Sequence, residues 1–294
     1  MNPVRFFNRF LVAAICSLFF IPLNAQHFEV GLGLGPTAYN GDLSVHSGKD
    51  IFGNMHVNGT VFGKYYLSPY LNLGLSASYG RISGDDRYAE TEELQIRNLN
   101  FQSDIIEMAL RLEFNIIGFE PYNFRSPWSP YLFAGIGGFM FNPEAEYQGN
   151  LIELQPLGTE GQGLDLYPER NEYDLTQIVL PFGLGVKIAL SEVFTLGFEV
   201  GYRHTFTDYL DDVSGDYVPY SVMLEERGEV VAALSDRRWE YLGVEPMDEM
   251  GSRGSRNGND GYIFSVLTIS YHFLDTGLGH SRQRRSKKSG CYTL

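Results

Sequence analysis

Four aspartates lie within nine positions of the segment TFTDYLDDVSGDY, residues 205–217: Asp208, Asp211, Asp212 and Asp216. Carboxylates at this density suggest a calcium site, because Ca²⁺ takes several oxygen ligands. The spacing does not match the helical calcium loop, since Gly215 is misplaced and the closing bidentate Glu is missing. We therefore predict no metal site, with these four residues as weak candidates. We expect them instead to cap a strand and order the loop after it through Asx-type turns and local arginine pairs.

Histidines are the next candidates for chemistry, at His46, His56, His204 and His272. An acyl-transfer enzyme needs a nucleophile, a base within hydrogen-bond reach and an oxyanion donor. None of these histidines lies close in sequence to a serine with an orienting carboxylate, and His204 has the parity of a lipid-facing residue. The sequence therefore predicts a protein that is not an enzyme and that uses no cofactor.

Strands must position these side chains, because strict alternation of apolar and polar residues recurs along the chain. The segment before the aspartates, VFTLGFEVGYRH, places Phe194, Leu196 and Phe198 on one face and Glu199 and Arg203 on the other. One of the eight strand-like segments, 131–141, is apolar on both parities, so its orientation is unreadable. The eight segments are 29–39, 56–66, 70–80, 104–116, 131–141, 178–190, 193–206 and 262–273.

The polar faces of these strands favour a membrane barrel over a soluble sandwich, which stays open as the alternative. They are rich in Gly, Ala and Ser and carry few charges, which could pair inside a narrow barrel. These charges are Glu29, Glu107, Glu113 and Glu199 against Lys64, Arg111, Lys187 and Arg203. An eight-stranded barrel has an interior just wide enough for its own side chains. Free conduction of solutes is therefore not expected.

The connections alternate in length, which is typical of outer-membrane barrels. LSPY (67–70) and LSEV (190–193) are tight turns, whereas 83–104, 142–176 and 208–259 are long, and the last two are strongly acidic. The predicted fold is an all-β, eight-stranded antiparallel transmembrane barrel of the outer membrane. Its short turns would be periplasmic and its long acidic loops extracellular, with both termini in the periplasm.

The two ends of the chain differ from the rest. Arg5 and Arg9, the apolar run 10–23 and Ala25 predict a signal peptide over residues 1–25. The barrel would then occupy residues 26–274, and a basic tail residues 275–294. That tail is either solvated or a periplasmic handle for an acidic partner, with Arg284 and Arg285 as possible contacts. An exported chain with net charge −14 is not expected to bind nucleic acid.

The connection IIGFEPYNFRSPWSP, residues 116–130, is long for the predicted periplasmic side and rich in aromatic residues and prolines. It could pack under the barrel, or it could form a docking surface for a partner. Tyr122, Phe124 and Trp128 are the candidate contacts in the second case.

Three segments resemble the PorG-like (DUF6089-like) family of outer-membrane barrels from the type IX secretion machinery of Bacteroidetes. They are YNGDLS (39–44), YLNLGLSASYGRISGDD (70–86) and above all GFEVGYRHTFTDYLDDVSGDY (197–217). The resemblance implies a barrel that anchors or associates with a periplasmic ring of PorK-like and PorN-like proteins, and that is not itself the translocation pore. The alternative is a stand-alone surface barrel resembling OmpA or OmpW, with a role in adhesion or membrane integrity.

Overall fold

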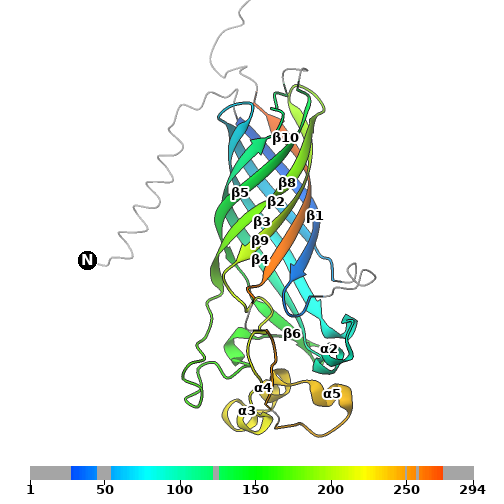
Figure 1. The fold of residues 1–294 in the computed structure, drawn as a ribbon, viewed down its shortest axis with the longest axis vertical. Coiled ribbons are helices and arrows are strands. Elements are labelled where there is room, and N and C mark those ends of the chain that lie inside the picture. Colours follow the sequence, from blue (N-terminus) through cyan, green and yellow to red (C-terminus); the bar gives the residue numbers. More distant parts are fainter. Residues whose placement is uncertain (1–27, 45–53, 122–125, 249, 256–257, 274–294) are drawn as a thin grey trace, which may run out of the picture.

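The computed structural model describes residues 28–44, 54–121, 126–248, 250–255 and 258–273. Eight antiparallel strands form a closed barrel, in which each strand pairs with its neighbours and β1 pairs with β10 (Figure 1). The predicted eight-stranded antiparallel barrel is therefore confirmed. The barrel strands are β1 (Phe28–Asn40), β2 (Val57–Tyr66), β3 (Leu71–Asp85), β4 (Asn100–Asn115), β5 (Trp128–Met140), β8 (Thr176–Ala189), β9 (Phe194–Thr205) and β10 (Gly261–His272).

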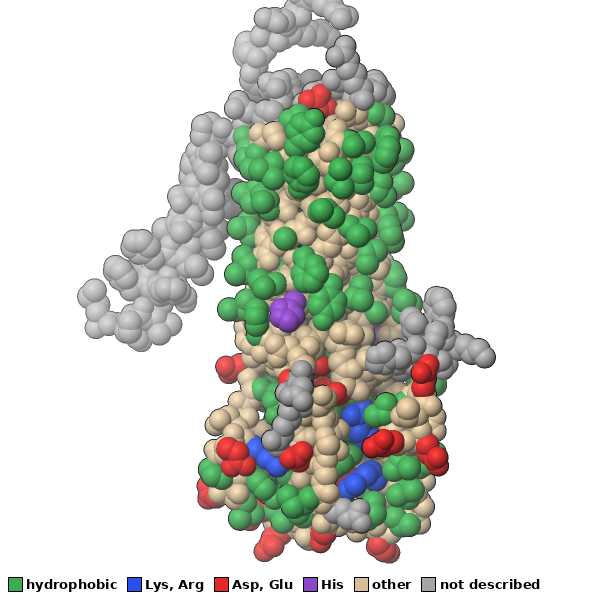
Figure 2. Space-filling model, viewed as in Figure 1, with side chains coloured by type: hydrophobic (Ala, Val, Ile, Leu, Met, Phe, Trp, Pro, Cys, Tyr) green, Lys and Arg blue, Asp and Glu red, His purple; other side chains and the backbone are tan. Residues whose placement is uncertain are grey.

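The outer surface of the barrel is apolar, as the alternation predicts. Leu32 and Leu184 are 56% and 60% exposed, and Figure 2 shows hydrophobic side chains covering the barrel wall. Their neighbours in sequence point inward and include the buried charges. An apolar exterior around a polar interior is the arrangement of a transmembrane β-barrel. Closure also pairs the backbone polar groups that lipid could not satisfy.

The segment whose orientation was unreadable is resolved as β5. Tyr131, Phe133 and Phe139 are buried inside the barrel, whereas Leu132 and Ile136 are exposed on its outer surface. These large rings fit inside the barrel because the adjacent strand β8 has a glycine beside one of them: Phe133 pairs in register with Gly183. Because the inward residues of this strand are aromatic, both of its faces are apolar, and alternation in the sequence does not reveal which face points inward.

The short turns lie together at one end of the barrel, which we call the turn end. In both LSPY and LSEV the serine orders the turn: Ser68 Oγ accepts from the Leu71 amide at 3.1 Å, and Ser191 Oγ from the Phe194 amide at 3.1 Å. The first and last described residues meet at the same end, where the Phe273 amide donates to the Phe28 carbonyl at 3.0 Å.

The long connections gather at the opposite end into an ordered structure (Figure 1). We call the described residues of 41–44, 54–56, 86–99, 141–175 and 206–260 the cap. None of its helices is long and apolar enough to cross a membrane among the residues described. Its elements are η2 (Asp86–Tyr88), α2 (Glu92–Arg97), β6 (Pro143–Tyr147), β7 (Asn150–Glu153), η3 (Gln155–Leu157), α3 (Tyr220–Arg227), α4 (Glu229–Ser235) and α5 (Arg238–Leu242).

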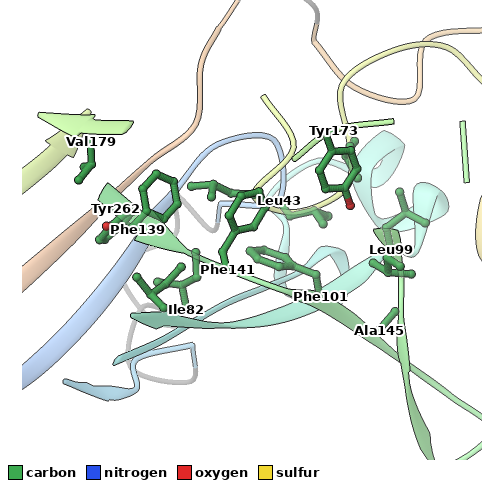
Figure 3. Packing of buried hydrophobic residues seen from close by; sticks show 14 of the residues in the cluster. Leu43, Ile82, Leu99, Phe101, Phe139, Phe141, Ala145, Tyr173, Val179 and Tyr262 are labelled. Carbon is green, nitrogen blue, oxygen red and sulfur yellow. The ribbon is translucent and has the colours of Figure 1, made fainter. Parts of the chain in front are cut away.

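The predicted loop 83–104 is shorter than expected, because β3 continues to Asp85 and β4 begins at Asn100. The extension is stabilised by a hydrophobic cluster at the junction of barrel and cap. Ile82, Phe101 and Ile105 from β3 and β4 pack there with Phe139 of β5 and Phe141 beyond it (Figure 3). A second cluster, which includes Val218, Met223 and Val231, packs within the cap itself.

Candidate functional site

The lumen at the turn end is built around one carboxylate between two lysines. Lys64 Nζ of β2 lies 2.7 Å from Glu113 Oε2, and Lys187 of β8 forms an ion pair with the other oxygen. Asn72 Nδ2 donates to Glu113 Oε1 at 2.8 Å. All these groups are buried or nearly so, and an unpaired charge at such a site would carry a desolvation penalty of several kcal/mol.

Two further pairs follow along the lumen toward the cap. Arg111 Nη2 lies 2.5 Å from Glu199 Oε2, which also accepts from the Tyr131 hydroxyl at 3.0 Å. Arg203 Nε lies 3.3 Å from Glu107 Oε2, which accepts from the Tyr262 hydroxyl at 2.8 Å. The six residues singled out as barrel-interior charges all lie in the lumen: Glu107, Arg111, Glu113, Lys187, Glu199 and Arg203.

Aromatic rings occupy the space around these pairs. The Arg111 guanidinium lies 3.8 Å from the centroid of the Phe133 ring, and that of Arg203 lies 4.6 Å from Phe264. A Cβ added at Gly201 would lie 2.6 Å from both Arg203 Nη1 and the Phe133 ring. The cavity beside Lys64, Arg111 and Glu113 measures about 10 Å³, room for about one water molecule.

The described residues 116–121, which follow β4, close the lumen at the turn end. Phe119 is 1% exposed, its amide donates to the Pro69 carbonyl at 2.8 Å, and its ring lies 4.7 Å from Lys187 Nζ. Trp128, at the start of β5, is 49% exposed and has the outward-facing parity of Leu132. Tyr122, Phe124, Arg284 and Arg285 lie outside the described residues, so their contact with a partner stays a prediction.

The four aspartates of the opening segment lie in the cap but do not converge. Asp208 accepts from Ser214 Oγ at 2.7 Å, and Asp211 from the amides of Leu43 and Val213 at 3.1 and 3.0 Å. Asp212 accepts from Thr159 Oγ1 at 2.5 Å and the Tyr173 hydroxyl at 2.7 Å, and Asp216 forms a backbone bridge with Ser252. Among the described residues no group of three or more His, Cys, Asp or Glu could hold a metal ion.

The arginines that pair with this region are not local ones. Arg253 is 3% exposed, donates to Glu160 Oε1 at 3.1 Å and to the Asp212 carbonyl at 2.5 Å, and reaches the Ser235 carbonyl at 3.1 Å. Arg97 binds both oxygens of Asp86 at 2.7 and 2.8 Å and donates to the Arg253 carbonyl at 3.0 Å. The expectation of local arginine pairs is therefore corrected: Arg253 comes from the far end of the same β9–β10 connection, 41 positions from Asp212, and Arg97 comes from the β3–β4 connection.

Two buried aspartates, Asp211 and Asp260, lie beside Tyr39, so the end of the first strand contacts the connection that precedes the last strand. The Tyr39 hydroxyl at the end of β1 donates to Asp260 Oδ1 at 2.8 Å and also interacts with the carboxyl group of Asp211. Asp260 Oδ2 accepts from the Leu210 amide at 2.9 Å. Burial raises the pKa of Asp211 to about 8, and burial together with the charge of Asp211 raises that of Asp260. At neutral pH the pair therefore retains a proton.

The sequence analysis did not identify a serine and a histidine that lie within hydrogen-bond distance of each other. His56 Nε2 and Ser83 Oγ lie 2.8 Å apart at the cap end of β2 and β3. A nucleophile of this kind requires a carboxylate that orients the imidazole. No hydrogen bond joins the other ring nitrogen of His56 to a carboxylate within the described ranges. Because the two residues are 27 positions apart, no local motif could have pointed to them.

One comparison with known proteins, that with family models, gives a family. The family model described as "Domain of unknown function (DUF6089)" matches residues 8–156 and 157–224. No curated protein matches at a significant level.

Solved outer-membrane barrels are similar at low identity. Neisserial surface protein A is 10% identical over 84% of this chain and 97% of its own, with a TM-score of 0.40. OprG from Pseudomonas aeruginosa is 11% identical over 84% and 95%, with a TM-score of 0.38. Ail from Yersinia pestis is 8% identical over 83% and 97%, with a TM-score of 0.37. Likeness at this level carries no information about function.

Proposed function

The chain belongs to the DUF6089 family, and we propose that it is a non-conducting, non-enzymatic structural barrel of the outer membrane that serves a protein secretion machinery. The filled lumen is the observation that supports a barrel that does not conduct solutes. Three sets of ion pairs, Glu113 with two lysines, Arg111–Glu199 and Arg203–Glu107, follow one another between the floor at Phe119 and the cap.

Ion passage would require these pairs to separate inside a medium of low dielectric constant. Removing one partner of a buried pair costs about 3–5 kcal/mol, and the barrel presents several in series. The junction cluster of Phe101, Phe139 and Phe141 would also have to move. A barrel that is this costly to open is suited to anchoring other proteins rather than to transport.

The role in secretion is supported by the sequence resemblance to PorG-like proteins. The most specific segment, 197–217, covers most of β9 and the buried turn around Asp211 and Asp212. YNGDLS supplies Tyr39, whose hydroxyl interacts with Asp211, and Leu43, whose amide donates to Asp211. On this proposal the cap is extracellular, the turn end is periplasmic, and PorK-like and PorN-like ring proteins bind at the turn end.

Co-purification tests this role. We would place an affinity tag in the exposed segment 243–245 of the cap, extract the outer membrane in mild detergent and identify the proteins recovered. Stoichiometric recovery of periplasmic ring proteins is expected, with loss of recovery for Trp128→Ala. Tyr88→Ala, which truncates an aromatic residue of similar exposure in the cap, serves as the matched control. Recovery of the barrel alone from wild-type membranes would refute the secretion role.

The ordered cap favours a second candidate function, that of a stand-alone surface barrel. The cap contains its own hydrophobic cluster around Met223 and a buried arginine, Arg253, with several acceptors. Such order is more than loop closure requires. On this alternative, variants of the cap surface would impair function, and Trp128→Ala would have no effect.

A further inference from the structure

A polar groove lies on the side of the cap and has no role in the anchoring function. It consists of two adjoining cavities of about 160 and 240 Å³, which share Arg87, Asn100 and Glu146 in their linings. The ends of β3 and β4 form one wall, and β6 and the start of α5 form the other. Each cavity is far larger than the space beside Lys64 in the lumen.

The two arginines of the groove are held in fixed orientations. Arg87 Nε donates to both oxygens of Asp85 at 3.0 and 2.9 Å, and its Nη2 donates to one of them at 2.5 Å. Arg237 donates to Glu240 Oε2 at 3.1 and 2.8 Å, and its Nη1 reaches the Glu146 carbonyl at 3.0 Å. Pre-orientation of this kind lowers the entropy cost of binding a ligand.

Other polar groups of the groove remain available. Asn100 Oδ1 accepts from the Glu146 amide at 2.9 Å, which fixes the side chain and leaves its Nδ2 with two donors. Among the described residues, neither the Glu146 carboxylate nor the Gln148 side-chain amide makes a hydrogen bond. The groove therefore offers donors (Arg87, Asn100) beside acceptors (Glu146) and a group that does both (Gln148).

The charges of the groove nearly cancel. Two guanidinium groups face three carboxylates, and the carboxylates of Asp85 and Glu240 are already paired with Arg87 and Arg237. A polyanion would meet the free carboxylate of Glu146, and a polycation would meet both arginines. An apolar ligand would leave many polar groups without their water partners, which costs affinity. A ligand rich in hydroxyl groups fits best, because each hydroxyl both donates and accepts.

We propose that this groove, lined by Arg87, Asn100, Glu146, Gln148 and Arg237, is a binding site for a neutral saccharide. The saccharide is either a glycan of the cell's own surface polysaccharide or one presented from outside the cell. The site is independent of the secretion role, since it lies at the end of the barrel opposite to Trp128.

Binding is measured by calorimetry on the full chain, folded in a detergent without a sugar headgroup. The probes are a panel of neutral oligosaccharides, the purified neutral surface polysaccharide of the native cell, a sulfated oligosaccharide and an oligolysine peptide. We expect saturable binding of at least one neutral saccharide, and whether the surface polysaccharide or the external panel binds identifies the source. Glu146→Ala and Arg87→Ala should each weaken this binding at least tenfold.

Glu226→Ala, which removes an exposed carboxylate from α3 outside the groove, is the matched control and should bind like the wild type. The heat-dependent gel mobility of each variant shows whether the barrel is folded. The proposal is overturned if no neutral saccharide binds, if the sulfated probe or the peptide binds more tightly, or if folded Glu146→Ala and Arg87→Ala bind like the wild type.

Discussion

The lumen and the cap of this barrel both bury many charged side chains, and they neutralise them in different ways. In the lumen, carboxylates are balanced by basic side chains, as where Glu113 lies between Lys64 and Lys187. In the cap, Asp211 and Asp260 lie around one tyrosine hydroxyl with no ion pair between either carboxylate and a basic side chain of the described residues. The lumen is thus neutral by pairing, whereas the cap depends in part on bound protons.

This difference implies that the structure of the lumen does not depend on mild changes in pH, whereas the structure of the cap does. Ion pairs buried inside a closed barrel have no low-energy alternative, since separating them would leave unpaired charges in a medium of low dielectric constant. A buried carboxyl group that loses its proton near neutral pH becomes an unpaired buried charge, and opening of the cap would hydrate that charge. We therefore expect the barrel to be insensitive to mild changes in pH and the cap to respond to them.

The largest effect is expected for Glu113→Ala. The substitution leaves Lys64 and Lys187 buried without their counter-charge, which costs about 3–5 kcal/mol. The free energy of unfolding in urea, measured in detergent or lipid, checks this value. Glu192→Ala, in the exposed turn 190–193, is the control and should change stability by less than about 0.5 kcal/mol. Equal stability of the two variants would show that the lumen pair is not needed.

The next effect is confined to the cap. Arg253→Ala removes the donor shared by Glu160, the Asp212 carbonyl and the Ser235 carbonyl, and leaves buried groups unsatisfied at a cost of about 3 kcal/mol. Amide hydrogen exchange should rise throughout the cap and stay unchanged in β2 and β9. Equal loss of protection in the barrel strands would show that the two regions unfold as one unit.

A smaller loss of stability is expected when a methyl group is added to an inward-facing glycine of the barrel wall than when a lumen charge is removed. Gly201→Ala would force Arg203 and Phe133 to move and should destabilise the barrel by about 1–3 kcal/mol. Gly59→Ala is the matched control, because the added methyl group meets only Leu34 Cδ2, at 3.5 Å. Thermal unfolding of the two variants provides the measurement, and equal melting temperatures would contradict a fully packed lumen.

The smallest effect, taken per unit of pH, is the change in the stability of the cap with pH. The pKa of Asp211 is raised to about 8 by burial, from an unfolded value near 3.8, so the closed cap binds more protons than the open one. Cap stability should therefore fall as pH rises from about 4 to 8 and level off above that. Asp211 alone changes the opening constant by at most tenfold per unit of pH, about 1.4 kcal/mol.

Tryptophan fluorescence can follow this titration, because the chain has two tryptophans and only Trp239 lies in the cap. In a Trp128→Phe background, Trp239 reports cap opening alone. Asp260→Asn should reduce the dependence on pH, since it removes one of the two titrating carboxyl groups and keeps a side-chain oxygen that can accept a hydrogen bond. A signal that is flat between pH 5 and 8 in the parent would contradict proton-dependent closure.

The barrel was predictable from sequence because its signals are local. Alternation with period two placed Ile106, Leu184 and Arg203 on the correct faces, and it failed only where Tyr131 and Phe133 replace polar residues inside. The cap was not predictable, because its order comes from contacts between distant segments. Arg253 has no motif around it, and its partner Glu160 is 93 positions away. The groove has no sequence signal for the same reason.

The central claim is that the lumen is sealed, and single-channel recording in planar lipid bilayers tests it most directly. The purified full chain should insert and give no conductance steps, whereas a triple variant with Lys64, Glu113 and Lys187 changed to alanine supplies the comparison with an emptied lumen. Discrete, reproducible ion-conducting steps from the wild-type protein would contradict the account and indicate a channel instead of an anchor.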